Sequence, residues 1–214
     1  IVNLIGDQLG GMTTTQVASL KVGQVAAIET RDLVNMTTSQ VAALTATQVK
    51  ALKSEQLQAL STGQIKALET DDIKSMSAAQ VSAFTTNQVR ALSSSQLNAL
   101  TVLELNALSD TQLQALSTDQ VSALSVTGTA KLKSTQVAAL STAQVAALTT
   151  SQVSALAATS VAAMGSNQLN ALTSTQVGAL TLAQVKALNV TTLSSLGTSQ
   201  VNALTTGQVA GLDR

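Results

Sequence analysis

A large apolar residue recurs at every eighth position from Leu4 to Leu212, without insertion or deletion, which gives 27 positions in register. A second apolar series lies three residues earlier, from Ile1 to Val209, and Thr129 is its only polar member. A strict, short period is typical of a repeat array rather than of an ordinary globular domain. We therefore expect a single octapeptide-repeat solenoid of about 27 units over residues 1–214, taken from a longer array.

The repeated octad has the consensus Leu-Thr/Ser-x-x-Gln-Val-x-Ala. Apolar residues three apart share one side of a helix but lie on opposite faces of a strand. Ser or Thr followed three residues later by Gln forms a capping box at a helix start. The octad therefore predicts one short helix of about six residues per unit. The Gln site holds Gln in 20 of 26 units, and the exceptions are Asp32, Asp72, Glu104, Gly128, Ser160 and Thr192.

One continuous helix does not fit this period. At about 100° per residue, eight residues rotate the apolar pair by roughly 80° per unit, so the apolar stripe would wind around the helix. The chain must therefore turn once per octad. We predict an all-α solenoid of very short helices, with about two or three helices in each turn of the solenoid. A parallel β-solenoid is the alternative, since Val and Thr favour strands and short repeats also build β-helices.

Representative residues define the predicted core and the predicted caps. The structural core is expected to include Leu44, Val49, Leu52, Leu100, Leu140, Val145, Leu148 and Leu204. The capping pairs are expected to be Thr45 with Gln48, Ser141 with Gln144, and Thr149 with Gln152.

The weakest unit, residues 125–132, lacks the Gln, the second apolar residue and the small residue before Leu132. Two interpretations stay open for this unit: a degenerate repeat in which Val126 shifts into the core, and a hinge between two subarrays.

The composition offers little for catalysis. The chain has no His, Cys, Trp, Tyr or Pro, so acid–base or nucleophilic chemistry would fall to Ser, Lys and carboxylates. We expect no enzyme activity, no cofactor and no metal. Glu69, Asp71 and Asp72 are the densest acidic cluster, but no calcium-binding loop surrounds them and lysines flank them. We expect them to form a solvated, acid-rich helix start.

Charge also limits the possible partners. The 11 basic and 11 acidic residues cancel, so nothing predicts binding to nucleic acid. No apolar run approaches the ~18 residues of a membrane span. Between Ser134 and Leu212 the only charged residue is Lys186. A surface so poor in charge favours self-association or a sugar coat.

The string Leu-Thr-x-x-Gln-Val-x-Ala-Leu resembles the octapeptide arrays of very large bacterial secreted and cell-surface proteins, many of them adhesin-like. The resemblance covers the whole chain and implies export, a spacer or surface-layer role, and polymerisation. The same string is similar to the opening helix of transcription-activator-like effector repeats. Those repeats run on for more than thirty residues and carry a base-reading loop, which this chain lacks, so DNA recognition is not expected.

These observations favour a structural protein: an extracellular solenoid that serves as filament subunit, sheath subunit or adhesin stalk. The partner would be a second copy of the chain in a head-to-tail homopolymer, because a solenoid without polar caps exposes apolar surface at both ends. Asp213 and Arg214 are at most a partial cap. A binding module that presents Ser/Thr rows to glycan or ice is the alternative, and a passive spacer is a third possibility.

Overall fold

The computed structural model describes residues 6–212 of the chain. Ile1, Leu4, Asp213 and Arg214, which the sequence places at the ends of the array, lie outside the described residues. The described part consists of short helices joined by short links, and it contains no strand. The predicted all-α solenoid is therefore confirmed, and the β-solenoid alternative is wrong. None of the described helices is long and apolar enough to cross a membrane.

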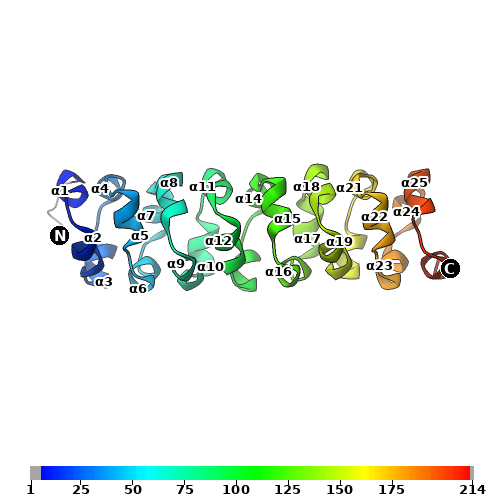
Figure 1. Cartoon of the computed structure of the whole chain (residues 1–214), viewed down its shortest axis with the longest axis horizontal. Coiled ribbons are helices and arrows are strands. Elements are labelled where there is room, and N and C mark those ends of the chain that lie inside the picture. The colour runs from blue at the N-terminus through cyan, green and yellow to red at the C-terminus, as the bar shows by residue number, and fades with distance from the viewer. Residues whose placement is uncertain (1–5, 213–214) are drawn as a thin grey trace. The chain divides into compact units, whose positions relative to one another are not determined.

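The chain divides into two compact units, residues 1–108 and 109–214. In unit 1 the helices run in chain order as α1 (Gly6–Gly10), α2 (Thr14–Ala18), α3 (Val22–Ala26), α4 (Thr30–Leu33), α5 (Thr38–Ala42), α6 (Ala46–Lys50), α7 (Ser54–Ala59), α8 (Thr62–Ala67), α9 (Thr70–Ser75), α10 (Ala78–Ser82), α11 (Thr86–Ala91), α12 (Ser94–Ala99) and α13 (Val102–Leu105) (Figure 1).

In unit 2 the series continues as α14 (Asp110–Ala115), α15 (Thr118–Ala123), α16 (Val126–Ala130), α17 (Ser134–Ala139), α18 (Thr142–Ala147), α19 (Thr150–Ala155), α20 (Ala158–Ala162), α21 (Ser166–Ala171), α22 (Ser174–Gly178), α23 (Leu182–Ala187), α24 (Val190–Ser194), α25 (Thr198–Asn202) and α26 (Thr206–Ala210). Each octad of the described chain therefore contributes one helix, as the capping pattern predicts.

A single octad shows why each helix is short. Ser141 precedes α18 with φ −68° and ψ 160°, and its side chain accepts a hydrogen bond from the backbone N–H of Gln144. Leu148 ends the helix with φ −59° and ψ 139°. Two successive extended residues, the Leu and the next cap, thus separate neighbouring helices. They redirect the chain after every helix, so no continuous helix forms.

Helices that are three apart in the series lie side by side. In unit 1, α4 packs on α1 and α8 on α5, and in unit 2, α18 packs on α15 and α23 on α20. Hydrogen bonds between successive turns join residues 28 to 31 apart in the sequence. Because three octads span 24 residues and four span 32, each turn holds between three and four helices.

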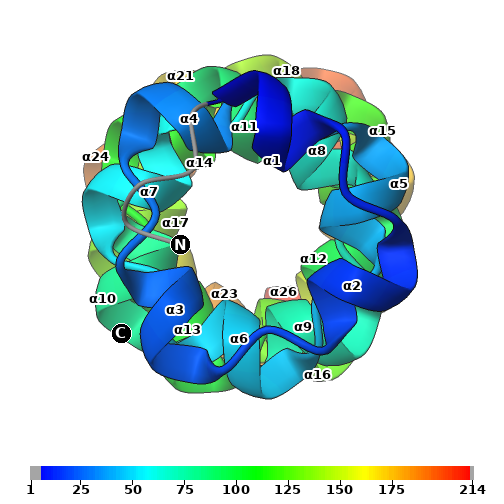
Figure 2. The same ribbon diagram turned by 90° about the vertical axis from the view of Figure 1, so that its left-hand side faces the viewer.

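The expected two or three helices per turn is therefore too few. A two-residue extended link bends the chain but does not reverse it, so the circuit closes only after more than three helices. Figure 2 shows unit 1 from its N-terminal end, where the chain runs clockwise away from the viewer from α1 through α2 and α3 to α4. Unit 1 is thus a right-handed superhelix.

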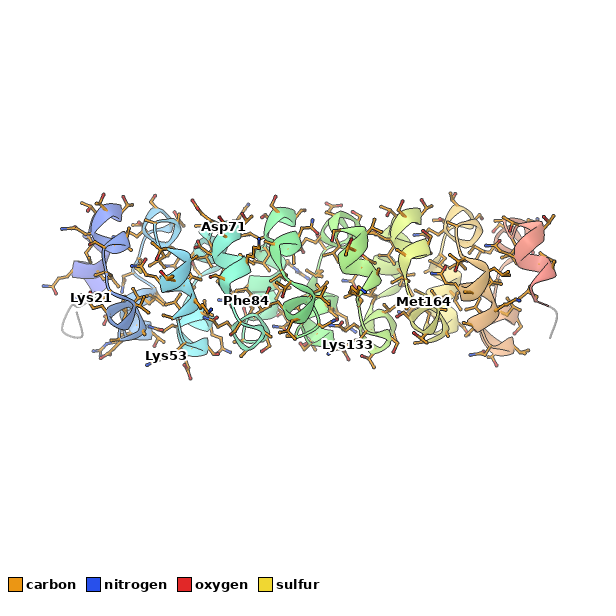
Figure 3. All side chains as sticks on the ribbon, turned by 90° about the horizontal axis from the view of Figure 1, so that it is seen from below. Lys21, Lys53, Asp71, Phe84, Lys133 and Met164 are labelled. Atoms are coloured by element: carbon orange, nitrogen blue, oxygen red, sulfur yellow. The ribbon has the colours of Figure 1, made fainter. Side chains whose placement is uncertain are left out.

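The two apolar series form the interior of each unit. Val49 and Val145 are fully buried, and the predicted core residues Leu44, Leu52, Leu140 and Leu148 are at most 5% exposed. Leu100 and Leu204, by contrast, are only partly buried. The larger side chains of Phe84 and Met164 lie inside, whereas Lys21, Lys53, Asp71 and Lys133 lie on the outside (Figure 3).

The degenerate octad at residues 125–132 still forms a helix, α16. Thr129 takes the core position and is fully buried, and its hydroxyl donates to the backbone carbonyl of Ser125 at 3.0 Å. Val126 is 44% exposed, so the predicted shift of Val126 into the core is wrong. The local hydrogen bond of Thr129 satisfies the hydroxyl, and the register is kept without a shift.

Candidate functional site

The repeated glutamine joins successive turns of the superhelix. In α19, Oε1 of Gln152 accepts a hydrogen bond from the backbone N–H of Thr149 at 2.7 Å. Its Nε2 donates to the carbonyls of Val121 at 2.9 Å and Leu124 at 2.8 Å, at the end of α15. We call this pair of contacts to the preceding turn of the superhelix, the turn below, a glutamine bridge. One buried side chain thus caps its own helix and holds the turn below it.

The bridge supplies a donor that the backbone lacks. A helix end leaves its last carbonyls without partners inside the helix. Leu124, the first residue of the extended link after α15, is such a position, and Nε2 of Gln152 reaches its carbonyl. A primary amide carries both an acceptor oxygen and two N–H donors. A carboxylate at the same site would cap the helix but would have no hydrogen to donate to the turn below.

The predicted capping residues lie where the sequence places them. Thr45 with Gln48 and Ser141 with Gln144 form capping boxes, as Thr149 with Gln152 does. The sequence interpretation gives these glutamines only the capping role. In the structure Gln48 also donates to the carbonyls of Val17 and Leu20, at 3.0 and 2.8 Å. Gln and Glu both complete a capping box, so capping alone does not explain why Gln is strongly preferred. This preference is the sequence signal for the second role.

Asp72 occupies one of the glutamine positions. It is 3% exposed, and its Oδ2 accepts from the backbone N–H of Glu69 at 2.8 Å. Burial raises the pKa of this carboxyl from 3.8 to about 6; the hydrogen bond from Glu69 opposes the shift, and the nearby charges of Glu69 and Asp71 add to it. The expectation of a wholly solvated acidic cluster is therefore wrong for Asp72, since the repeat places this side chain in the interior.

The outer surface of the described residues has a polar groove but no cluster placed to bind a metal. Among residues 6–212, no group of three or more His, Cys, Asp or Glu side chains is placed to hold a metal ion. Unit 2 has a shallow groove of about 360 Å³ whose walls are mainly hydroxyl and amide groups. The groove is lined by Asn170, Leu172, Thr173, Ser174, Ser195, Gly197, Ser199 and Gln200. Its lining residues are all uncharged, and their hydroxyl and amide groups offer hydrogen bonds.

The first and last described turns carry complementary groups. Gln16 and Gln24 accept from the N-cap backbones of Thr13 and Lys21, but within residues 6–212 their Nε2 groups meet no acceptor. At the other end Val201 and Val209 are 48% and 51% exposed, although other residues of the same series, such as Val145 and Val185, are fully buried. The first turn thus offers Nε2 donors for glutamine bridges. The last turn offers the apolar surface that a following turn would cover.

The short capped helices, the regular interior and the glutamine bridges define a helical-solenoid repeat protein. The family model of the ALTTAQ repeat matches residues 25–62, 65–102, 130–158 and 180–213, which is more than half of the chain. The chain therefore belongs to the ALTTAQ repeat family. Glu104, Gly128 and Ser160, three of the residues that replace the glutamine, fall between the matched segments. No curated protein matches the chain significantly.

Proposed function

We propose that this chain is a non-catalytic structural protein that assembles by end-to-end stacking. In this role it would serve outside the cell, as a filament subunit, a sheath subunit or the stalk of an adhesin. The single observation that carries the proposal is the complementarity of the first and last described turns. Each turn inside a unit is held by buried apolar side chains and glutamine bridges, and a second copy of the chain can supply the same contacts.

The donors of such a contact lie in the first turn. Gln16 and Gln24 already have their Oε1 atoms fixed by the N-cap backbones of Thr13 and Lys21, at 2.8 and 2.7 Å. In Gln48 and Gln152 the same fixed geometry directs Nε2 at the turn below. Gln16 and Gln24 are therefore oriented for a turn that a second copy would provide.

The acceptors and the apolar surface lie in the last turn. Leu204 is partly exposed, and Val201 and Val209 are about half exposed. Covering apolar surface contributes about 25 cal/mol per Å². The two faces differ, so the contact is heterologous, and repeated contacts of this kind build a ring or an open filament.

The charge distribution supports the same proposal. Between Ser134 and Leu212, Lys186 is the only charged residue, so little electrostatic repulsion opposes the approach of a second copy at this end of the chain. The resemblance to arrays in bacterial cell-surface proteins supports the extracellular setting.

The experiment uses two variants, each blocked at one end. Gln16→Glu/Gln24→Glu keeps the capping oxygens and removes the donors of the first turn. Leu204→Asp/Val209→Asp places charge on the last turn. Light scattering after size-exclusion chromatography should show concentration-dependent polymers for the wild type and monomers for each variant alone.

An equimolar mixture of the two variants should form a 1:1 dimer, because one intact first turn meets one intact last turn. Ser151→Asp, on the exposed side of α19, is the matched control and should still polymerise. A wild type that stays monomeric at every concentration would contradict the proposal. Polymers that persist in both blocked variants would indicate side-by-side packing instead.

The groove of unit 2 favours a second candidate, a binding surface for glycan. Its hydroxyl and amide lining matches the hydrogen-bonding groups of a sugar. Saturation-transfer NMR with a panel of oligosaccharides would test it, and Ser174→Ala/Ser199→Ala should reduce any transfer. The candidate fails if no sugar gives a signal that depends on these hydroxyls.

A further inference from the structure

The helices without a glutamine bridge are not scattered in either unit. In unit 1 the bridges from α9 to α5 and from α13 to α9 are missing, because Asp72 and Glu104 replace the glutamines. In unit 2 the bridges from α20 to α16 and from α24 to α20 are missing, because Ser160 and Thr192 replace them. Each bridge joins a helix to the fourth helix before it, so the missing bridges in each unit fall on one series of helices. We call this series the unbridged line; it consists of α5, α9 and α13 in unit 1 and of α16, α20 and α24 in unit 2.

Asp72, Glu104 and Thr192 form hydrogen bonds within their own octads and not to the turn below. Oε2 of Glu104 accepts from the backbone N–H of Thr101 at 2.7 Å, as a glutamine oxygen would. The hydroxyl of Thr192 donates to the carbonyl of Asn189 in the preceding link, at 3.0 Å. An ionised carboxylate has no hydrogen to donate, and Ser160 and Thr192 are shorter than glutamine. Successive turns along these lines therefore lack the bridge found elsewhere.

Two further differences from the consensus occur at α9 and α20. Ala157 precedes α20 and provides no side-chain cap, so this helix lacks both the cap and the bridge. Met76 follows α9 and Met164 follows α20, where most units have Leu. Met is unbranched and fills irregular gaps in a core. Met76 and Met164 are 3% and 2% exposed, so the interior of these two octads contains an unbranched side chain.

We propose that each unit opens along its unbridged line, so that successive turns separate there before they separate elsewhere. Local opening is governed by the interactions that a segment must break. The helices on the unbridged lines lack the inter-turn hydrogen bonds that the glutamine bridges supply elsewhere. Because each turn holds fewer than four helices, a line through every fourth helix winds around the unit: in Figure 2, α5 lies on the right, α9 at the lower right and α13 at the lower left. Separation of successive turns therefore begins along this winding line, which gives each unit a built-in path of compliance beyond the proposed structural role.

Hydrogen exchange of backbone amides in the full chain tests the proposal in unit 2. The amide of Val161 in α20 should exchange about tenfold faster than those of Val153 in α19 and Val177 in α22, near the upper effect of one net hydrogen bond. All three amides donate to the N-cap carbonyl of their own helix, at 3.1, 2.9 and 2.9 Å. The comparison is therefore between like positions.

The double variant Ser160→Gln/Met164→Leu restores the consensus and should slow the exchange of the Val161 amide to the rate of the bridged helices. Ala157→Ser restores only the cap and should slow it less. The converse variant Gln176→Ser/Leu180→Met should accelerate exchange in α22. If the restoring variant disturbs the fold, Thr192→Gln provides the same test on α24 through the amide of Leu193.

Equal exchange rates for α19, α20 and α22 in the wild type would overturn the proposal. Full recovery with Ala157→Ser alone would also overturn it, because the weakness would then belong to the missing cap and not to the missing bridge.

Discussion

Replacing Gln152 with Glu separates the two roles of the bridging glutamine. The substitution keeps the shape of the side chain and an oxygen for the backbone N–H of Thr149, so the cap is retained. It removes the Nε2 donor to the carbonyls of Val121 and Leu124, which lie 2.9 and 2.8 Å away. Gln152 is 1% exposed, so solvent cannot replace the lost contacts easily.

The magnitude follows from these contacts. A typical hydrogen bond contributes about 0.5–1.5 kcal/mol net, and an acceptor left unpaired in the interior costs about 1–3 kcal/mol. Two lost bonds therefore predict a destabilisation of about 2–4 kcal/mol near neutral pH. The exposed Gln58 is the matched control, and Gln58→Glu should change the free energy of unfolding by less than about 0.5 kcal/mol.

Urea denaturation followed by circular dichroism measures both variants, and hydrogen exchange shows whether the loss is centred on α15 and α19. A second readout is acidification. Burial raises the pKa of a carboxyl at this repeat position, as it does for Asp72. An uncharged carboxyl can donate one hydrogen bond, so the deficit of the Gln152→Glu variant should shrink as the pH falls below neutral. If Gln152→Glu and Gln58→Glu have equal effects at neutral pH, the bridge is not a stabilising contact and the reasoning is refuted.

Three further outcomes follow from the structure. Glu104→Gln should stabilise unit 1 by about 1 kcal/mol, because it adds the missing donor without changing the shape of the side chain; a thermal melt shows this as a higher Tm. The folded-state pKa of Asp72, about 6, lies above its ordinary value of 3.8, so the stability of the wild type should fall as pH rises from about 4 to 7. Asp72→Asn should remove this dependence, and an unchanged pH profile of Tm in the variant would contradict the assignment. Leu140→Asp places a charge at a position that is 5% exposed and should lower the free energy of unfolding by more than about 3 kcal/mol. Backbone amides of α17, α18, α20 and α21 should lose their protection from hydrogen exchange, and a loss confined to a single helix would contradict the packing.

Much of the fold can be predicted from one octad. The three-residue spacing of Val145 and Leu148 and the pairing of Ser141 with Gln144 together indicate a short capped helix, and the structure contains it. The strict period also requires a turn in every unit. These features are predictable because they depend on contacts within eight residues.

The number of helices per turn and the role of the glutamine Nε2 were not predictable in the same way. Both depend on contacts between residues 28 to 31 apart in the sequence. The sequence repeat, by contrast, looks the same at every octad boundary. The clue lay in the strong preference for Gln over Glu at the site, because only an amide both caps and donates. Val126 shows a related limit: a buried threonine that satisfies its own hydroxyl can replace an apolar residue without any shift of register.

Cryo-electron microscopy of assemblies of the purified chain would show whether copies stack end to end. We expect filaments in which a second copy continues the superhelix, with the Nε2 atoms of Gln16 and Gln24 within hydrogen-bonding distance of last-turn carbonyls such as those of Leu196 and Leu204. Single unassembled particles at every concentration, or copies packed side by side with both terminal turns uncovered, would contradict this expectation.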